Sequence, residues 1–390
     1  MEGKKLNILF ISSWYPNKSN PTLGNFVEKH AKAANLYCNV AVLHVAFAPL
    51  DSKNKFQFDY KIVNEMPVLI IYINNNYKYL PVIGGIIRFF KYVKAYHRGY
   101  NFLKLKHGKP DLVHANVLFP VGIIALLFIN VYKIPYVFTE HWTGYMPDDP
   151  NRISNVCRIV SIMAAQKAKM LMPVSDDLML AMKGNGIEGN YQLVPNVIDT
   201  DIFCINSSLS KSNKFRFIHI SSLDDAQKNI TGIINAVEQL SHFRNDFELL
   251  IIGDGEADKY IKMAEQLNIL NKIVRFESEK PTEEIALLLQ QSHCLLMFSN
   301  YESFSVVIAE AMACGLPVIA SRAGGLANEL SSRHGIIINA GNITALTNSM
   351  NEMMNNYHHY NKTEIAAFAQ RFSFKKVGSL FYDIYRKVIN

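Results

Sequence analysis

The sequence predicts an α/β fold in which two doubly wound domains follow one another along the chain. Short apolar runs of the kind found in buried parallel strands alternate with helix-forming segments throughout. The length of 390 residues, with 49% hydrophobic and 19% charged residues, is enough for two ordinary globular cores. A Ser- and Asn-rich stretch at 201–213 separates the two halves. We therefore expect domains at residues 1–200 and 201–371, followed by a terminal helix at 372–390.

The first half opens with a buried strand at 6–12, which runs into a polar turn containing Gly24. A helix at 25–35 should follow, and a strand, a glycine-containing loop and a helix form a natural cradle for a phosphate or a sugar. The alternative is that Gly24 serves only the turn. The segment before the strand at 68–73 is expected to be irregular. The other strands of this half are expected at 39–47, 111–116, 135–141 and 169–175, and the other helices at 79–107, 117–129 and 153–168.

His141 is a candidate site residue because its strand ends in the polar residues Thr139, Glu140 and His141. Ligands of open α/β folds bind at the carboxyl ends of parallel strands. The alternative is a histidine with a purely structural role.

The longest apolar run, at 117–129, holds 13 residues and contains Pro120 and Gly122. A bilayer-spanning helix needs about 20 apolar residues, so this run predicts a buried core helix and no transmembrane segment. The five cysteines are scattered, odd in number and without C-x-x-C spacing, which favours buried thiols in a reducing cytosol over disulfides or a zinc site.

The second half repeats the alternation, with strands expected at 215–221, 247–253, 273–278, 294–299 and 317–321, and helices from about 229 and 281. A further helix should begin after Ser303 or Ser305, either of which can cap it, and should end at Gly315. Gly324 and Gly325 then leave the backbone without side chains beside the expected start of a helix. Bare backbone N–H groups in such a place suit a phosphate.

Two carboxylates flank the start of that helix. Glu302 lies in the loop before it, and Glu310 lies inside its apolar body. Burying an ionised carboxylate is costly unless it is hydrogen-bonded, and a pair of sugar hydroxyl groups would satisfy it. The alternative is that Glu310 faces solvent on an amphipathic helix.

The run ESFSVVIAE followed by AMACGLPVIASRAGG resembles the signature of the retaining glycosyltransferases of family 4. The resemblance implies the GT-B fold, in which two Rossmann-like domains face one another across a cleft and the terminal helix crosses back to the first domain. It also implies that Glu310 binds the ribose of a sugar nucleotide and that Glu302 contacts the transferred sugar. The helix N-terminus around Phe304 and Ser305, together with Gly324 and Gly325, would meet the diphosphate, although most members have glycine where Ser305 stands.

The same resemblance assigns residues outside this stretch. In SSLDDAQKN, Lys228 takes the place of the lysine that neutralises the donor diphosphate. Ser221 and Ser222 replace the usual Gly-Arg, so a phosphate-binding arginine is missing at Ser222. Arg322 either substitutes for it or is an exposed arginine without a role. His141 would hydrogen-bond the donor sugar, and the loop of Gly24 would close over the diphosphate.

The implied activity is transfer of a hexose-type sugar from a nucleotide diphosphate sugar to an acceptor hydroxyl with retention of anomeric configuration. No cofactor and no metal are expected, because no Asp-x-Asp stands in a metal-binding context. The acceptor would be a glycan or a lipid-linked glycan, and no nucleic acid is expected as a partner. The alternatives are a sugar-nucleotide epimerase of similar architecture and a non-catalytic nucleotide-sugar-binding protein.

The segment 78–109 carries eight Lys and Arg residues and no Asp or Glu, interleaved with aromatic and aliphatic residues. A basic amphipathic helix of this kind can lie on an anionic membrane surface. The alternative is a helix that packs its apolar stripe on the sheet and leaves its basic face in water. Members of the family often build lipid-linked bacterial surface polysaccharides, so the expected location is cytoplasmic, peripheral on the inner face of the cell membrane.

Overall fold

The structure is a computed structural model and describes residues 5–48, 56–74 and 83–389. The chain forms two compact units. Unit 1 comprises residues 1–145, 152–197 and 374–390, and unit 2 comprises residues 146–151 and 198–373. The chain therefore passes into unit 2 at residues 146–151 and again after Val197, and its terminal helix belongs to unit 1.

Unit 1 contains a seven-stranded sheet with the strand order β3-β4-β2-β1-β5-β6-β7. Every neighbouring pair is parallel except β3 and β4. The strands are β1 (Asn7–Ser12), β2 (Asn39–Ala48), β3 (Phe56–Val63), β4 (Met66–Asn74), β5 (Leu112–Asn116), β6 (Tyr136–Glu140) and β7 (Leu171–Pro173). The central strands are almost fully buried, which explains their continuous apolar runs.

The antiparallel edge strand β3 was not expected from the sequence, which predicted an irregular segment there. A two-residue turn joins β3 to β4, and both of its residues, Asn64 and Glu65, have positive φ, at 49° and 63°. This is the backbone geometry of a type I′ hairpin, for which Asn-Gly is the usual sequence signal. This turn lacks the usual signal because Glu65 stands where glycine is expected.

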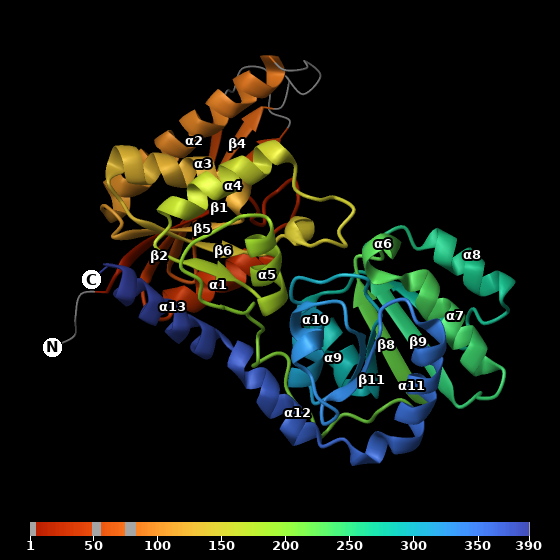
Figure 1. The fold of residues 1–390 in the computed structure, drawn as a ribbon. Coiled ribbons are helices and arrows are strands. Elements are labelled where there is room, and N and C mark those ends of the chain that lie inside the picture. Colours follow the sequence, from red (N-terminus) through yellow and green to blue (C-terminus); the bar gives the residue numbers. More distant parts are fainter. Residues whose placement is uncertain (1–4, 49–55, 75–82, 390) are drawn as a thin grey trace. The chain divides into compact units, whose positions relative to one another are not determined.

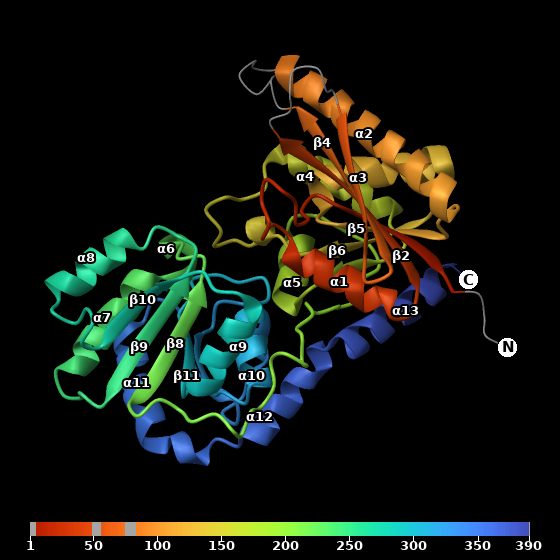
Figure 2. The same cartoon turned by 180° about the vertical axis from the view of Figure 1, so that it is seen from behind.

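Helices cover both faces of the unit 1 sheet. On one face lie α2 (Ile83–His107), α3 (Leu118–Leu127) with its continuation η1 (Phe128–Tyr132), and α4 (Asn155–Lys167) (Figure 1). On the other face, α1 (Asn25–Asn35) and α13 (Phe374–Ile389) lie side by side (Figure 2). The short α5 (Asp176–Gly184) follows β7. A Cβ atom on Gly378 of α13 would lie 2.2 Å from the Ala33 carbonyl oxygen of α1, so glycine allows this close packing.

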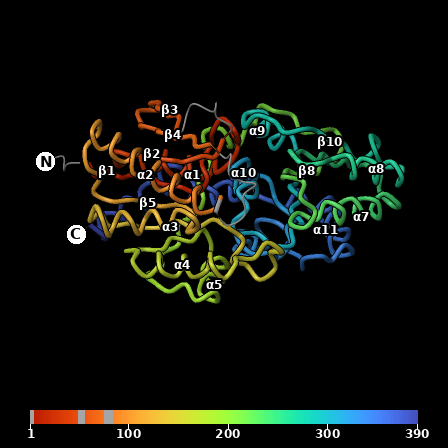
Figure 3. The backbone as a smooth tube through the Cα atoms, turned by 90° about the horizontal axis from the view of Figure 1, so that it is seen from above, coloured from red at the N-terminus to blue at the C-terminus, as the bar shows by residue number. Residues whose placement is uncertain are grey.

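Unit 2 contains a parallel six-stranded sheet with the order β10-β9-β8-β11-β12-β13. Its strands are β8 (Phe215–Ser221), β9 (Phe247–Gly253), β10 (Val274–Ser278), β11 (Cys294–Met297), β12 (Val318–Ser321) and β13 (Gly335–Ile338). Its helices are α6 (Asp225–Lys228), α7 (Ile230–Ser241), α8 (Asp258–Gln266), α9 (Thr282–Gln291), α10 (Val306–Ala313), α11 (Ile343–Asn356) and α12 (Lys362–Ala369). Helices α7 and α11 pack side by side (Figure 3).

The predicted α/β class, with two wound sheets and helices on their faces, is confirmed. The apolar run at 117–129 forms α3 and part of η1 within unit 1, where Val121 and Ile124 are fully buried. Within the residues that the structure describes, none of the helices has the length and apolar character needed to cross a membrane.

Candidate functional site

Each sheet has a topological switch point. At this point, the connection from one strand runs to one side of the sheet, and the connection that leads to the neighbouring strand runs to the other side. In unit 2, β8 leads to β9 on one side, whereas β10 leads back to β11 on the other side of β8. In unit 1, β1 leads to β2, whereas β4 leads to β5. Open α/β sheets bind ligands in the crevice at the carboxyl ends of the strands at such a point. The residues at these ends are therefore the first candidates for a site.

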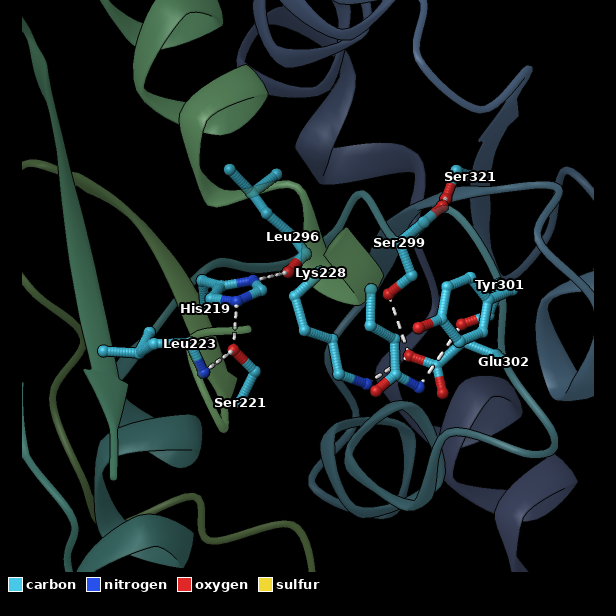
Figure 4. Close-up of polar contacts among 10 residues, drawn as sticks. His219, Ser221, Leu223, Lys228, Leu296, Ser299, Tyr301, Glu302 and Ser321 are labelled. Atoms are coloured by element: carbon cyan, nitrogen blue, oxygen red, sulfur yellow. Dashed lines mark hydrogen bonds and ion pairs between the residues drawn. The ribbon is translucent and has the colours of Figure 1, made fainter. Parts of the chain in front are cut away.

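Lys228 and Glu302 meet at the switch point of unit 2. Lys228 Nζ donates a hydrogen bond to Glu302 Oε1, and the two side chains form an ion pair that is 13% and 7% exposed. Ser299 follows β11, and its Oγ donates to the same carboxylate oxygen over 2.8 Å (Figure 4). The Ser299 carbonyl oxygen in turn accepts a hydrogen bond from Ser321 Oγ at the end of β12. Ser299 was not predicted as a site residue, although it is the polar residue that ends the run CLLMFS.

Backbone hydrogen bonds hold the loops of Lys228 and Glu302 together. Asn300 donates from its backbone N to the Gln227 carbonyl oxygen over 2.7 Å, and from Nδ2 to the Ala226 carbonyl oxygen over 2.9 Å. The backbone N of Glu302 donates to the Ala323 carbonyl oxygen over 2.8 Å. These hydrogen bonds hold the backbone near Lys228 and the backbone of Glu302 in place, so the backbone as well as the two side chains positions the ion pair.

The short helix α6 presents Lys228 and was not expected from the sequence. Asp224 caps it by accepting from the backbone N of Ala226 over 3.1 Å, and Asp225 accepts from both N and Oγ1 of Thr231. Asn229, at φ 51°, separates α6 from α7. The two aspartates therefore hold backbone and hydroxyl groups at the ends of helices. In the described part of the chain, no three His, Cys, Asp or Glu side chains cluster closely enough to hold a metal ion.

Helix α10 begins at the residue after Ser305, but the expected side-chain cap is wrong. Ser305 occupies the N-cap position in a left-handed conformation, with φ 68° and ψ 80°, and its side chain makes no capping hydrogen bond. The Phe304 ring is buried against the Phe372 ring, while its carbonyl oxygen accepts from the backbone N of Leu326 over 2.9 Å. The backbone at the start of α10 therefore lies against the glycine loop.

Gly324 and Gly325 both require glycine. Gly324 has φ 94° and ψ −178°, a conformation essentially restricted to glycine, and Gly325 has φ 62°. A Cβ atom on Gly325 would lie 2.8 Å from Phe304 Cα. A 3₁₀ segment, Gly325–Glu329, follows.

Glu310 is only 8% exposed on α10. The alternative of a solvent-facing Glu310 is therefore wrong. Helix α10 is buried on nearly all sides, so a carboxylate inside it is held in the protein interior.

The place of the missing arginine is occupied by a tightly packed turn. Ser221 Oγ accepts from the backbone N of Leu223 over 3.1 Å and contacts His219 Nε2 at 2.8 Å (Figure 4). Burial lowers the pKa of His219 to about 4, so this imidazole is neutral. Cβ atoms on Gly253 and Gly255 would lie 2.3 Å from the carbonyl oxygens of Ser221 and Ser222, so the Gly-Asp-Gly turn packs directly on this loop.

Ser222 is exposed at the edge of that turn, and Arg322 is exposed after β12. The backbone N of Arg322 donates to the Ile338 carbonyl oxygen over 2.7 Å, which extends the pairing of β12 with β13. Its exposure agrees with the alternative of an arginine that faces solvent.

In unit 1, Gly24 lies at the start of α1. It has φ 69°, and a Cβ atom there would lie 2.6 Å from the carbonyl carbon and oxygen of Trp14. Its own carbonyl oxygen accepts from the backbone N of Val27 over 2.9 Å. Glycine at this position thus lets the loop after β1 fold against the N-terminus of the helix.

His141 lies at the carboxyl end of β6 and is buried, at 5% exposed. Its Nδ1 contacts Asn196 Oδ1 at 3.1 Å, and its Nε2 contacts Asn116 Oδ1 at 3.4 Å. Burial holds the pKa of His141 well below its ordinary value, with smaller contributions from His30 and His114. Asparagine side chains therefore lie against both nitrogens of this neutral ring, and only one of the two nitrogens carries a hydrogen that it can donate to an Oδ1.

Glu140, beside His141, is a structural anchor. Its carboxylate accepts from the backbone N of Leu118 and His141 over 2.8 Å and of Trp142 over 2.9 Å. Burial nevertheless raises its pKa to about 7.

Models of two protein families match this chain. The one described as glycosyl transferases group 1 matches residues 203–370, and the one described as glycosyltransferase family 4 matches residues 65–202. N-acetyl-alpha-D-glucosaminyl L-malate synthase from Bacillus anthracis is 26% identical over 300 residues, which is 72% of this chain and 75% of that protein. D-inositol 3-phosphate glycosyltransferase from Corynebacterium jeikeium is 26% identical over 244 residues, covering 55% and 57% of the two chains.

Solved structures share the fold. Sucrose-phosphate synthase from Thermosynechococcus elongatus superposes with a TM-score of 0.77 at 17% identity, over 98% of this chain and 99% of that chain. Anabaena HepE in complex with UDP-glucose gives a TM-score of 0.72 at 19% identity, over 98% and 100% of the two chains. With its two wound sheets and both family models matched, the chain belongs to the family 4 glycosyltransferases of the GT-B fold, which transfer a sugar from a nucleotide sugar.

Proposed function

We propose that this protein is a retaining, metal-independent glycosyltransferase that moves a hexosyl group from a nucleotide diphosphate sugar to a hydroxyl group of a glycan or lipid-linked acceptor. The observation that carries the proposal is the Lys228–Glu302 pair at the switch point of unit 2. In this pair, a cation that suits a diphosphate lies next to a carboxylate that suits sugar hydroxyl groups. Both stand where open α/β sheets bind their ligands.

The chemistry follows from the charge that develops as the sugar leaves. When the bond between the anomeric carbon and the diphosphate breaks, negative charge grows on the leaving diphosphate. Lys228, the N-terminus of α10 and the backbone of Gly324 and Gly325, which carry no side chains, can stabilise that charge without a metal ion. Glu302 then faces the sugar, and Glu310 accepts hydrogen bonds from the ribose hydroxyl groups.

The roles of Gly24 and His141 are part of the same proposal. Gly24 lets a loop approach a diphosphate closely. For His141 to bind the donor sugar, one ring nitrogen has to exchange its contact with Asn116 or Asn196 for a sugar hydroxyl. This role can be tested with His141→Gln, in which one amide nitrogen and one amide oxygen replace the two ring nitrogens.

A panel of UDP-, GDP- and ADP-sugars tests the reaction, beginning with UDP-glucose because Anabaena HepE forms a complex with it. We expect nucleoside diphosphate release that depends on an added acceptor, a product with the donor's anomeric configuration by NMR, and unchanged rates in EDTA. The Glu302→Gln variant should lose this release. Free nucleotide with a rearranged sugar and no acceptor would instead identify an epimerase. Nucleotide binding without turnover would identify a non-catalytic binding protein.

We also propose that unit 1 docks on an anionic membrane, which would bring a lipid-linked acceptor to the enzyme at the cytoplasmic face. Residues 78–82 of the basic segment lie outside the described residues, and the rest forms α2 and the turn that follows it. Arg98 and Lys106 turn towards β3, where they lie over the rings of Phe56 and Tyr60, at 5.0 and 4.5 Å from the centroids. Arg98 and Lys106 therefore contact aromatic rings of this protein, and the support for membrane docking does not come from these two residues.

The support comes from the whole layer formed by α2, α3, η1 and α4. These helices carry eight Lys and Arg residues and no Asp or Glu. Among the residues that the structure describes, half of the large exposed hydrophobic side chains lie on these helices: Ile86, Phe89, Phe90, Leu105, Val131, Val156, Ile159 and Met163. On α4, Val156, Ile159 and Met163 share one helical face and are 53–69% exposed. Exposed apolar groups among cations suit the boundary between lipid headgroups and acyl chains.

A further inference from the structure

Ser305 combines two unfavourable features at the N-terminus of α10. It is a non-glycine residue with φ 68°, and it is only 8% exposed. In the part of the chain that the structure describes, its Oγ is buried without a hydrogen-bond partner. A left-handed serine and an unpaired buried hydroxyl each lower the stability of the free protein. Glycine at this position would remove both costs.

The surroundings of this hydroxyl are suited to an anion. The first backbone N–H groups of an α-helix have no partner within the helix, and the helix dipole makes this end positive. An N-cap serine normally accepts a hydrogen bond from one of these N–H groups, but Ser305 does not. Its O–H group is therefore free to act as a donor beside a row of other donors.

The loop after β8 explains why an additional donor would matter here. In the family that this sequence resembles, an arginine at the position of Ser222 supplies several N–H groups to the diphosphate, whereas a serine hydroxyl is short and carries no charge. Lys228 already shares its charge with Glu302. The site therefore has fewer positive charges for a diphosphate than the arrangement that it resembles.

We propose that the Ser305 hydroxyl donates a hydrogen bond to the diphosphate of the donor and so replaces part of the stabilisation that an arginine at Ser222 would give. This inference rests on the proposed function. It assigns the side chain, and not only the backbone at this helix end, to diphosphate recognition.

Two variants separate the hydroxyl from the backbone. Ser305→Ala removes the hydroxyl and keeps a side chain at positive φ, whereas Ser305→Gly removes the hydroxyl and the strain together. The probes are UDP, GDP and ADP with UMP, GMP and AMP, and the pair used is the one whose diphosphate binds the wild type most tightly. Both variants should bind that diphosphate about tenfold more weakly and leave the monophosphate affinity unchanged. Ser305→Gly should also raise the melting temperature.

Ser175→Ala is the matched control, because Ser175 is a buried N-cap serine whose Oγ accepts from the backbone N of Leu178 over 3.2 Å in unit 1. It should lower the melting temperature and leave the preference for diphosphate over monophosphate unchanged. Wild-type diphosphate affinity in Ser305→Gly would overturn the proposal, as would equal losses for both nucleotides. A wild type that binds none of the six nucleotides would overturn the donor site itself, and this inference with it.

Discussion

Lys228 and Glu302 are 74 positions apart in the sequence, and in the structure each carries the charge that neutralises the other. Lys228 ends the short helix α6, whereas Glu302 follows β11. Because the two strands that lead to these loops are neighbours in the sheet, the loops meet at one edge. A diphosphate that enters the site must therefore compete with Glu302 for the ammonium group.

A double-mutant cycle tests this pair. Lys228→Ala leaves a nearly buried carboxylate without its cation, so it should lower the free energy of unfolding by about 3 kcal/mol and lower turnover by at least about 100-fold. Adding Glu302→Gln should restore part of the stability, with a coupling of about 1–3 kcal/mol, but not the turnover. Urea unfolding and turnover assays measure both quantities. Additive stability losses would contradict the ion pair.

Gly325→Ala should be strongly destabilising. The new Cβ would lie 2.8 Å from Phe304 Cα, and φ is 62°, so we expect a loss of about 2 kcal/mol or more in the free energy of unfolding. Gly85→Ala in α2 is the control, because its Cβ would meet nothing within 4 Å. It should stabilise by about 0.5–1 kcal/mol. If chemical unfolding shows the same change in stability for Gly325→Ala and Gly85→Ala, the backbone at Gly325 and Phe304 can move apart to admit a Cβ atom.

Glu310→Gln should weaken nucleotide binding through the ribose. A carboxylate can accept from two hydroxyl groups, whereas an amide offers one acceptor oxygen, so about 1.5–3 kcal/mol is at stake. Isothermal titration with UDP and 2′-deoxy-UDP separates the ribose from the phosphates. The wild type should prefer the ribonucleotide, and the variant should lose that preference. A folded variant with an unchanged preference would exclude Glu310 as the ribose ligand.

Two buried groups in unit 1 should give stability–pH slopes of opposite sign. Burial lowers the pKa of His44 to about 4, so its contribution to stability is complete above pH 6.5 and is lost as the pH falls from 6.5 towards 4. Burial raises the pKa of Glu140 to about 7, so its contribution is complete below pH 4.5 and is lost as the pH rises towards 7. Each slope is about 1.4 kcal/mol per pH unit within its window.

Urea unfolding between pH 5 and 6.5 measures these slopes, because both windows cover that range. As the pH falls, the free energy of unfolding should decrease less steeply in His44→Gln and more steeply in Glu140→Gln than in the wild type. Each change in slope should be about 1.4 kcal/mol per pH unit, which corresponds to one proton. Unchanged slopes in both variants would show that neither group has a different proton affinity in the folded and unfolded states.

The membrane proposal predicts binding to phosphatidylcholine vesicles only when they contain phosphatidylglycerol, and release at high salt. Lys94→Gln with Arg158→Gln should weaken binding by about 1 kcal/mol per charge, and Ile159→Gln with Met163→Gln should weaken it without changing its salt dependence. Phe243→Gln, at an exposed phenylalanine of unit 2, is the matched control and should bind like the wild type. Co-sedimentation that ignores lipid charge and salt, or no binding, would contradict the proposal.

The α/β class, most strand and helix positions, and the strand–helix–strand pattern around Glu302 and Glu310 could be predicted from local patterns in the sequence, because buried parallel strands and glycine-rich turns have strong local signals. The position of β3 could not be predicted, since a Glu-containing type I′ turn lacks the usual Asn-Gly signal.

Which polar groups lie in contact depends on the folding of the whole chain and could not be predicted from local patterns. The convergence of Lys228 and Ser299 on Glu302 Oε1, the burial of Glu310, and the enclosure of His141 by two asparagines all depend on strand order, which brings residues from distant parts of the sequence to one edge of a sheet. Strand order cannot be predicted from a local pattern of residues, because the pairing of parallel strands depends on the packing of the whole sheet.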